Sequence, residues 1–81
     1  MKRHTARLRA PADFGLAVQQ ARLARGLSQS QLAAELGVTQ SAISEIESGK
    51  STIYLRRLLS IARATGLELS ASWEDADATR G

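Results

Sequence analysis

The side chains best suited to recognition chemistry lie between residues 28 and 47, and most of them are uncharged amides and hydroxyls. Thr39 is a candidate N-cap, which places Gln40 and Ser41 in the first turn of a helix with their side chains free. A glutamine amide can pair with N6 and N7 of adenine, because it donates and accepts at once. The free N–H groups at a helix start suit a phosphate. These residue types indicate hydrogen-bonded recognition.

Two short helices must position these side chains. Hydrophobic residues recur at helical spacing on one face of each helix, namely Leu32, Ala33 and Leu36, then Ile43 and Ile46. Ser28 and Gln31 form a capping-box pattern at the first start, and Gly37 sits where the chain must reverse. Two helices joined by a tight glycine turn are the arrangement that lays one helix in a DNA groove.

Size and composition favour one small helical domain. The chain has 81 residues, of which 43% are hydrophobic but only 4% aromatic, and no cysteine. The hydrophobic and aromatic percentages favour packing of helices through Leu, Ile and Ala. The absence of cysteine excludes disulfides and thiolate zinc sites. Because no apolar run approaches the roughly 20 residues of a membrane span, and no apolar segment follows the basic start, we expect a soluble, cytoplasmic protein.

Residues 11–66 are expected to form the DNA-binding domain. Pro11 suits a first helical position, and the opening helix ends at Gly26. After the two central helices, Gly49 stops the third, and a further helix ends near Thr65, before Gly66. Its inner face carries Leu55, Leu58, Leu59 and Ala62.

The two ends of the chain differ in charge. Residues 1–10 carry four basic and no acidic residues, and we expect a mobile basic arm, although Thr5 to Arg9 alternate well enough for a short strand. Residues 75–81 are expected to be an acidic, disordered tail. Oppositely charged ends suggest two different partners, or simply frayed, solvated termini.

Residues 67–74 alternate between apolar and polar side chains, which predicts a β-strand. A lone strand leaves its backbone groups unpaired and its apolar face uncovered. We therefore expect this strand to pair antiparallel with the same strand of a second subunit. The predicted dimer interface consists of Leu67, Leu69, Ala71 and Trp73.

The run from Val18 to Gly66 resembles the Xre family of DNA-binding domains, which includes the lambda-type repressors and Cro. The resemblance is carried by Arg22, Gly26-Leu27-Ser28-Gln29, Leu32-Ala33, Gly37-Val38-Thr39-Gln40, Ile43-Ser44, Ile46-Glu47 and Gly49-Lys50. The segment from Gly66 to Trp73 looks like the C-terminal strand of HipB-like antitoxins, whose dimers join such strands and which bind HipA-type kinase toxins.

The resemblance implies an all-α, lambda-repressor-like bundle of four to five helices, with the C-terminal β-strand paired across a homodimer. The recognition helix would run from Gln40 to Glu47. The candidate base contacts are Gln40, Ser41, Ser44, Thr39 and Glu45. The candidate phosphate contacts are Gln29, Ser28, Lys50, Arg56 and Arg57.

The family pattern also pairs Arg22 with Glu47 in an ion pair that links the first helix to the end of the recognition helix. This role is structural, so Glu47 would not be a catalytic carboxylate. The sequence has no clustered histidines and no glycine-rich phosphate loop beside a strand, and we expect no enzyme activity, metal site or cofactor.

Two functions remain open. The first is an antitoxin that represses its own operon and neutralises a HipA-like kinase toxin. The second is a free-standing Xre-type regulator, such as a phage repressor or restriction controller, with no toxin partner. In both, a homodimer would bind a pseudo-palindromic operator in double-stranded DNA, with half-sites about one helical turn or a multiple apart.

Overall fold

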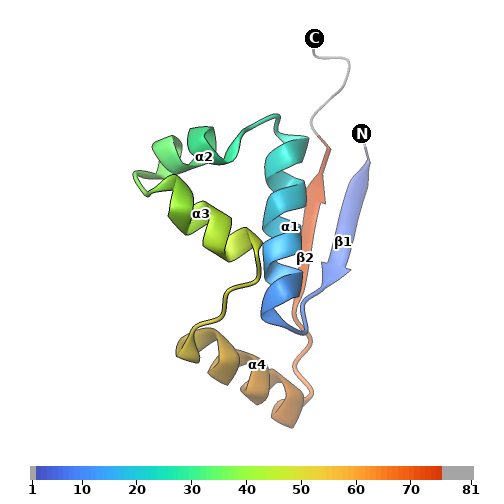
Figure 1. Ribbon diagram of the computed structural model, residues 1–81. Helices are drawn as coiled ribbons and strands as arrows, with labels where there is room; N and C mark the ends of the chain where they lie inside the picture. The colour runs from blue at the N-terminus through green and yellow to red at the C-terminus, as the bar shows by residue number, and fades with distance from the viewer. Residues whose placement is uncertain (1, 76–81) are drawn as a thin grey trace.

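The computed structural model describes residues 2–75, which form four helices and two strands (Figure 1). The elements in chain order are β1 (Arg3–Arg7), α1 (Pro11–Ala24), α2 (Gln29–Leu36), α3 (Gln40–Glu47), α4 (Ile53–Thr65) and β2 (Ser70–Glu74). The mostly helical architecture agrees with the prediction, with four helices in the described part of the chain. The strands add a small sheet that was only partly expected.

The helix ends follow the predicted capping chemistry. Ser28 Oγ accepts from the backbone N–H of Gln31 at 3.0 Å, and the Gln31 amide oxygen accepts from the backbone N–H of Ser28 at 2.7 Å. Thr39 Oγ1 caps α3 by accepting from Ala42 N at 3.1 Å. Gly37 ends α2 with a φ of 70°, in the left-handed region where side chains are strained. The turn between α2 and α3 is thus set by local sequence.

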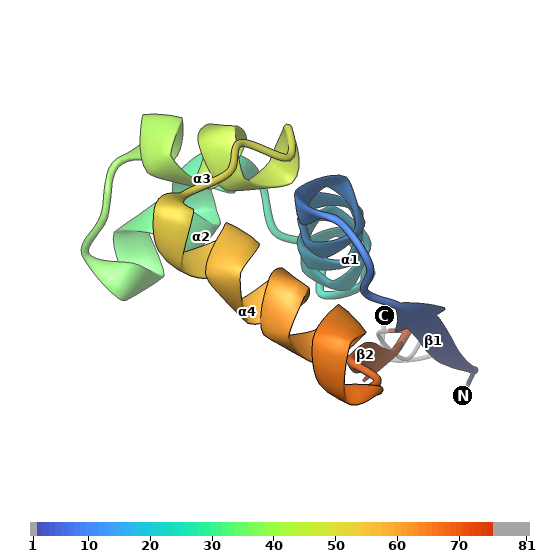
Figure 2. The same cartoon turned by 90° about the horizontal axis from the view of Figure 1, so that it is seen from below.

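α1 lies between the sheet and α3, as Figures 1 and 2 both show. Gly15 faces the end of α3 so closely that a Cβ added there would lie 2.5 Å from the carbonyl oxygen of Ile46 and 2.6 Å from that of Glu47. Only a residue without a side chain fits between the two backbones. Gly15 therefore sets the distance between α1 and α3.

The buried core is small. Its buried hydrophobic residues are Ala17, Ala33, Ile43, Leu59 and Ala62. Leu36 and Ile46, predicted to lie on inner faces, are instead 61% and 47% exposed. Leu58 of α4, predicted to lie on an inner face as well, is 37% exposed. For Leu36 and Ile46 the reason is geometric. α2 and α3 each have only about two turns, so few of their side chains face the core fully.

The C-terminal strand finds its partner within the same chain. β2 pairs antiparallel with β1, in a register that places His4 opposite Trp73 and Ala6 opposite Ala71. The prediction of an unstructured basic arm over residues 1–10 is therefore wrong for Arg3–Arg7. We expected β2 to need a second subunit because a lone strand has unpaired backbone groups and an uncovered apolar face. That reason no longer holds, because β1 pairs with the backbone groups along one edge of β2 and α1 packs beside the sheet.

The charged ends also meet each other. Arg3 lies 3.1 Å from Glu74, and Arg7 lies 3.4 Å from Glu68. The His4 ring stacks on Trp73 with centroids 5.5 Å apart. Opposite charges facing one another across two strands favour this register, so the charge asymmetry does not require two external partners. Residues 76–81, most of the predicted acidic tail, lie outside the described residues.

Replacing Gly15 by alanine tests the close approach of α1 and α3. Alanine normally stabilises a helix interior by about 0.5–1 kcal/mol relative to glycine. Here we expect crowding to outweigh that gain, with Gly15→Ala lowering the midpoint of thermal unfolding by about 5 °C or more. The control is Gln20→Ala on the exposed side of the same helix, which should leave the midpoint unchanged or higher. An unchanged Gly15→Ala midpoint would contradict the packing.

A cross-strand disulfide tests whether the strands pair within one chain. Thr5 and Ser72 are directly opposite and exposed, and the chain has no other cysteine to interfere. After oxidation, the double variant Thr5→Cys/Ser72→Cys should migrate as a monomer in a non-reducing denaturing gel. A covalent dimer as the main product would mean that the strands are exchanged between subunits.

Candidate nucleic-acid interface

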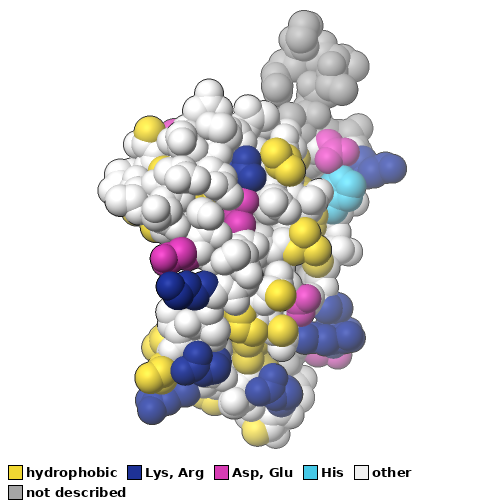
Figure 3. Space-filling model, in the orientation of Figure 1, with side chains coloured by type: hydrophobic (Ala, Val, Ile, Leu, Met, Phe, Trp, Pro, Cys, Tyr) yellow, Lys and Arg dark blue, Asp and Glu magenta, His cyan; other side chains and the backbone are white. Residues whose placement is uncertain are grey.

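The predicted base-contacting residues gather at the start and along the outer side of α3. Thr39, Gln40, Ser41 and Glu45 are exposed, whereas Ser44 is half-buried. Figure 3 shows mainly white surface, made of uncharged polar side chains and backbone, over α2 and α3, while most Lys and Arg side chains visible on this face lie lower, toward α4. Gln40 and Ser44 are therefore not enclosed in the protein interior.

A bidentate ion pair ties α1 to the end of α3. Arg22 donates from Nε to Glu47 Oε2 at 2.6 Å and from Nη2 to Glu47 Oε1 at 2.9 Å. Its remaining terminal nitrogen, Nη1, donates to the carbonyl oxygen of Leu27 at 2.7 Å, in the turn before α2. Both side chains are nearly enclosed, at 8% and 3% exposed. Arg22 is thus occupied by the fold.

The environment of this pair shifts the pKa values of both groups. The hydrogen bonds from Arg22 lower the pKa of Glu47, against the opposing effect of burial, and Gln29 lowers it further. In turn, the hydrogen bonds to Glu47 raise the pKa of Arg22. The pair therefore stays ionised at neutral pH, with one carboxylate serving three helices.

Gln29 connects this ion pair to the recognition residues. Its Nε2 donates to Glu47 Oε1 at 3.0 Å, and its Oε1 accepts from Nε2 of Gln40. The Gln40 amide is thereby held in one orientation, with its oxygen and one N–H hydrogen unused by this bond. The Glu47 carboxylate thus holds Gln29 at the start of α2 directly, and Gln40, a predicted base contact, through Gln29.

The caps limit what Ser28 and Thr39 can do. Each hydroxyl oxygen accepts a backbone N–H of its own helix, so its main role is structural. A hydroxyl that accepts one bond still has its own hydrogen to donate. Both residues therefore retain one donor for an anion beside the helix start.

Four of the predicted DNA contacts are charged, namely Glu45, Lys50, Arg56 and Arg57. Lys50 Nζ lies 3.4 Å from Glu45 Oε2, which joins a predicted phosphate contact to a predicted base contact. Arg56 Nη1 donates to Ser51 Oγ at 3.2 Å, and Arg57 is exposed on α4. Ser51 beside Arg56 was not singled out from the sequence. The periodicity of the sequence does not identify Ser51, because its proximity to Arg56 depends on where α4 begins.

The double role of Gln29 was also missed. The sequence suggested a phosphate contact, but the geometry adds contacts to Glu47 and Gln40. These partners lie 18 and 11 positions away in the chain, so no local pattern announces them.

The described residues contain no group of three or more side chains placed to hold a metal ion. No helix within residues 2–75 combines the length and apolar character needed to cross a membrane.

The comparisons with known proteins gave one match. A family model described as helix-turn-helix matches residues 18–71, which include all of α2, α3 and α4. Neither the curated proteins nor the solved structures gave a match.

The pH dependence of stability tests the Arg22–Glu47 pair. A lowered pKa means that Glu47 stabilises the fold above the ordinary carboxyl value of 4.5 and that this contribution is lost as the pH falls through the lowered pKa. At pH 7, we expect Glu47→Gln to reduce the free energy of unfolding by about 3 kcal/mol, because it leaves Arg22 buried without a counter-charge.

Below about pH 4.5 the gap between wild type and Glu47→Gln should narrow, because protonation removes the same charge. Urea unfolding at a series of pH values measures this difference. The matched control is Glu35→Gln, an exposed carboxylate on α2. A gap for Glu47→Gln that stays constant from pH 7 to pH 3 would contradict the assignment.

Proposed function

The chain belongs to the Xre-type helix-turn-helix family, and we propose that it is a sequence-specific DNA-binding transcription regulator that inserts α3 into the major groove. The observation that carries the proposal is the exposed Gln40 amide, fixed by Gln29 at the start of α3. A side chain held in place before binding loses less conformational freedom on contact with a base. A glutamine so held suits an adenine edge.

Base and phosphate contacts divide along the proposed interface. Gln40, with Ser41, Ser44, Thr39 and Glu45 beside it, reads base edges in this proposal. Phosphate contacts come from the surrounding residues Gln29, Ser28, Lys50, Arg56 and Arg57. Gln29 keeps one N–H hydrogen for a phosphate, because its other contacts use one hydrogen and the oxygen. The cationic side chains set affinity and salt dependence rather than sequence preference.

We further propose that the protein binds a pseudo-palindromic operator as a homodimer. The support is an apolar stripe on α4, where Tyr54, Leu58 and Ile61 are 83%, 37% and 55% exposed. These residues recur at helical spacing on one side, and exposed apolar patches on small domains commonly mark interfaces. The outer edges of the two-stranded sheet offer a second route to pairing.

The antitoxin hypothesis, with a HipA-like kinase as partner, rests on the resemblance of the segment from Gly66 to Trp73. In this chain that segment is paired with β1, which removes the argument that it must pair across a dimer. The alternative, a free-standing regulator, needs no further partner. Isolation of the protein from its native host separates the two, since only an antitoxin would bring a kinase with it.

Truncating the proposed base reader tests sequence-specific binding. Operator fragments would first be selected from a random duplex library by the wild-type protein. We then expect Gln40→Ala to weaken operator binding by about 1–3 kcal/mol and to leave binding to random DNA nearly unchanged. Fluorescence anisotropy at fixed salt measures both. Gln20→Ala, an exposed glutamine on α1, serves as the matched control. Equal losses on operator and random DNA would refute base reading by Gln40.

A further inference from the structure

A second surface with defined chemistry lies at the end of α4 that is far from α3. A cleft of about 320 Å³ opens between the end of β1, the segment before β2 and the C-terminal half of α4. We call it the Arg9–Arg63 cleft, after the two arginines on its opposite walls. An adjoining hollow of about 300 Å³ shares Arg9, Leu59 and Arg63 and adds Arg56.

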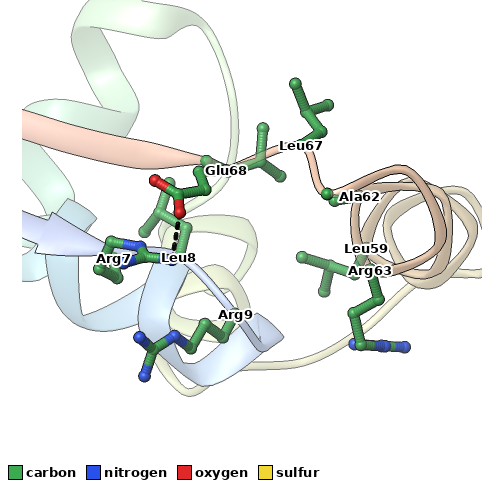
Figure 4. Close-up of a pocket in the computed structure, with 10 residues that line it drawn as sticks. Arg7, Leu8, Arg9, Leu59, Ala62, Arg63, Leu67 and Glu68 are labelled. Carbon is green, nitrogen blue, oxygen red and sulfur yellow. Dashed lines mark ion pairs between the residues drawn. The ribbon is translucent and has the colours of Figure 1, made fainter.

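The floor of the cleft is apolar. Leu8, Leu59 and Leu67 come from three different segments, and Figure 4 shows them around one gap. Leu59 is 4% exposed, whereas Leu67 at the rim is 52% exposed. A leucine side chain left half in water beside a cleft offers apolar contact to a bound group.

The rim carries positive charge that the fold does not neutralise. Figure 4 shows Arg9 and Arg63 on opposite sides of the gap, while Arg7 is turned to Glu68. Within residues 2–75, none of Arg9, Arg56 and Arg63 forms an ion pair with a carboxylate. Arg63 and Arg56 instead donate to the hydroxyls of Ser60 and Ser51.

These features together select an occupant. A second copy placed on this face about a two-fold axis would bring arginines against arginines. DNA phosphates would use the arginines but gain nothing from the leucine floor. A peptide that combines carboxylates with a large apolar side chain satisfies both the rim and the floor.

We propose that the Arg9–Arg63 cleft binds an acidic segment of a partner protein, with an apolar side chain inserted between Leu8, Leu59 and Leu67. The cleft is at the lower end of the roughly 300–1,000 Å³ typical of ligand pockets, so it admits one or two side chains. Figure 2 shows α4 running from α3 toward the strands, so this site and the recognition helix lie at opposite ends of α4. A protein partner and a duplex can therefore be bound together.

Peptide titrations observed by NMR test this site without DNA, so the outcome is independent of the proposed DNA binding. The probe is the capped peptide Glu-Glu-Leu-Glu-Glu, added to the ¹⁵N-labelled full chain. We expect shifts of the backbone amides of Leu8, Leu59 and Leu67, with a dissociation constant of roughly 0.1–1 mM. The peptide Glu-Glu-Ser-Glu-Glu should bind several-fold more weakly, because it cannot fill the apolar floor.

Paired variants separate this site from general attraction between opposite charges. Arg9→Gln/Arg63→Gln should weaken binding of the leucine peptide on the order of tenfold, since both charge-assisted contacts are lost. The matched control Lys2→Gln/Arg25→Gln removes the same charge from exposed positions outside the cleft and should change binding by less than about twofold. All four positions are exposed, so the fold should be retained.

Two results would overturn the proposal. Equal dissociation constants for the leucine and serine peptides would show that the apolar floor of the cleft contributes nothing to peptide binding. Shifts of the cleft amides by random duplex DNA, together with weaker DNA binding by Arg9→Gln/Arg63→Gln, would assign this surface to the nucleic acid instead.

Discussion

The buried ion pair between Arg22 and Glu47 joins the helices at the centre of this fold. Glu47 accepts from Arg22 of α1 and from Gln29 of α2, while Arg22 also binds the carbonyl of Leu27. The two buried charges must remain paired, because burying either one without its partner would be costly in free energy. The pair thus fixes the relative positions of three helices whose hydrophobic core is small.

The same pair is linked to the side chain of Gln40, the proposed base contact. Gln29 bridges the Glu47 carboxylate and the Gln40 amide. A hydrogen-bonded chain therefore links the buried ion pair to the exposed side chain at the start of α3. Gly15 complements this arrangement by letting α1 approach the end of α3 without a side chain between them. Electrostatic and steric constraints therefore act at the same helix junction.

The proposed base contacts and the Arg9–Arg63 cleft lie toward opposite ends of α4. Pairing of β1 with β2 brings the basic start and acidic end of the chain together, whereas neither Arg9 nor Arg63 forms an ion pair with a carboxylate within residues 2–75. In the proposed assignment, uncharged polar groups on α3 read DNA at one end of α4. Arginines around an apolar cleft bind an acidic protein segment at the other. The two ends differ in chemistry, which allows two kinds of partner.

The helices, their caps and the turn between α2 and α3 could be predicted from the sequence, because these features depend on residues within three or four positions of each other. The sequence also predicted a C-terminal strand over residues 67–74, of which only Ser70–Glu74 forms β2, with Leu67 and Leu69 before its start. The pairing of this strand with β1 could not be predicted, since it joins residues more than 60 positions apart and no local pattern encodes that choice. The Gln29 bridge and the grouping of Arg9 with Arg63 follow the same rule. Both features join segments that are distant in the sequence. The chemical character of each residue could therefore be predicted, but its neighbours could not.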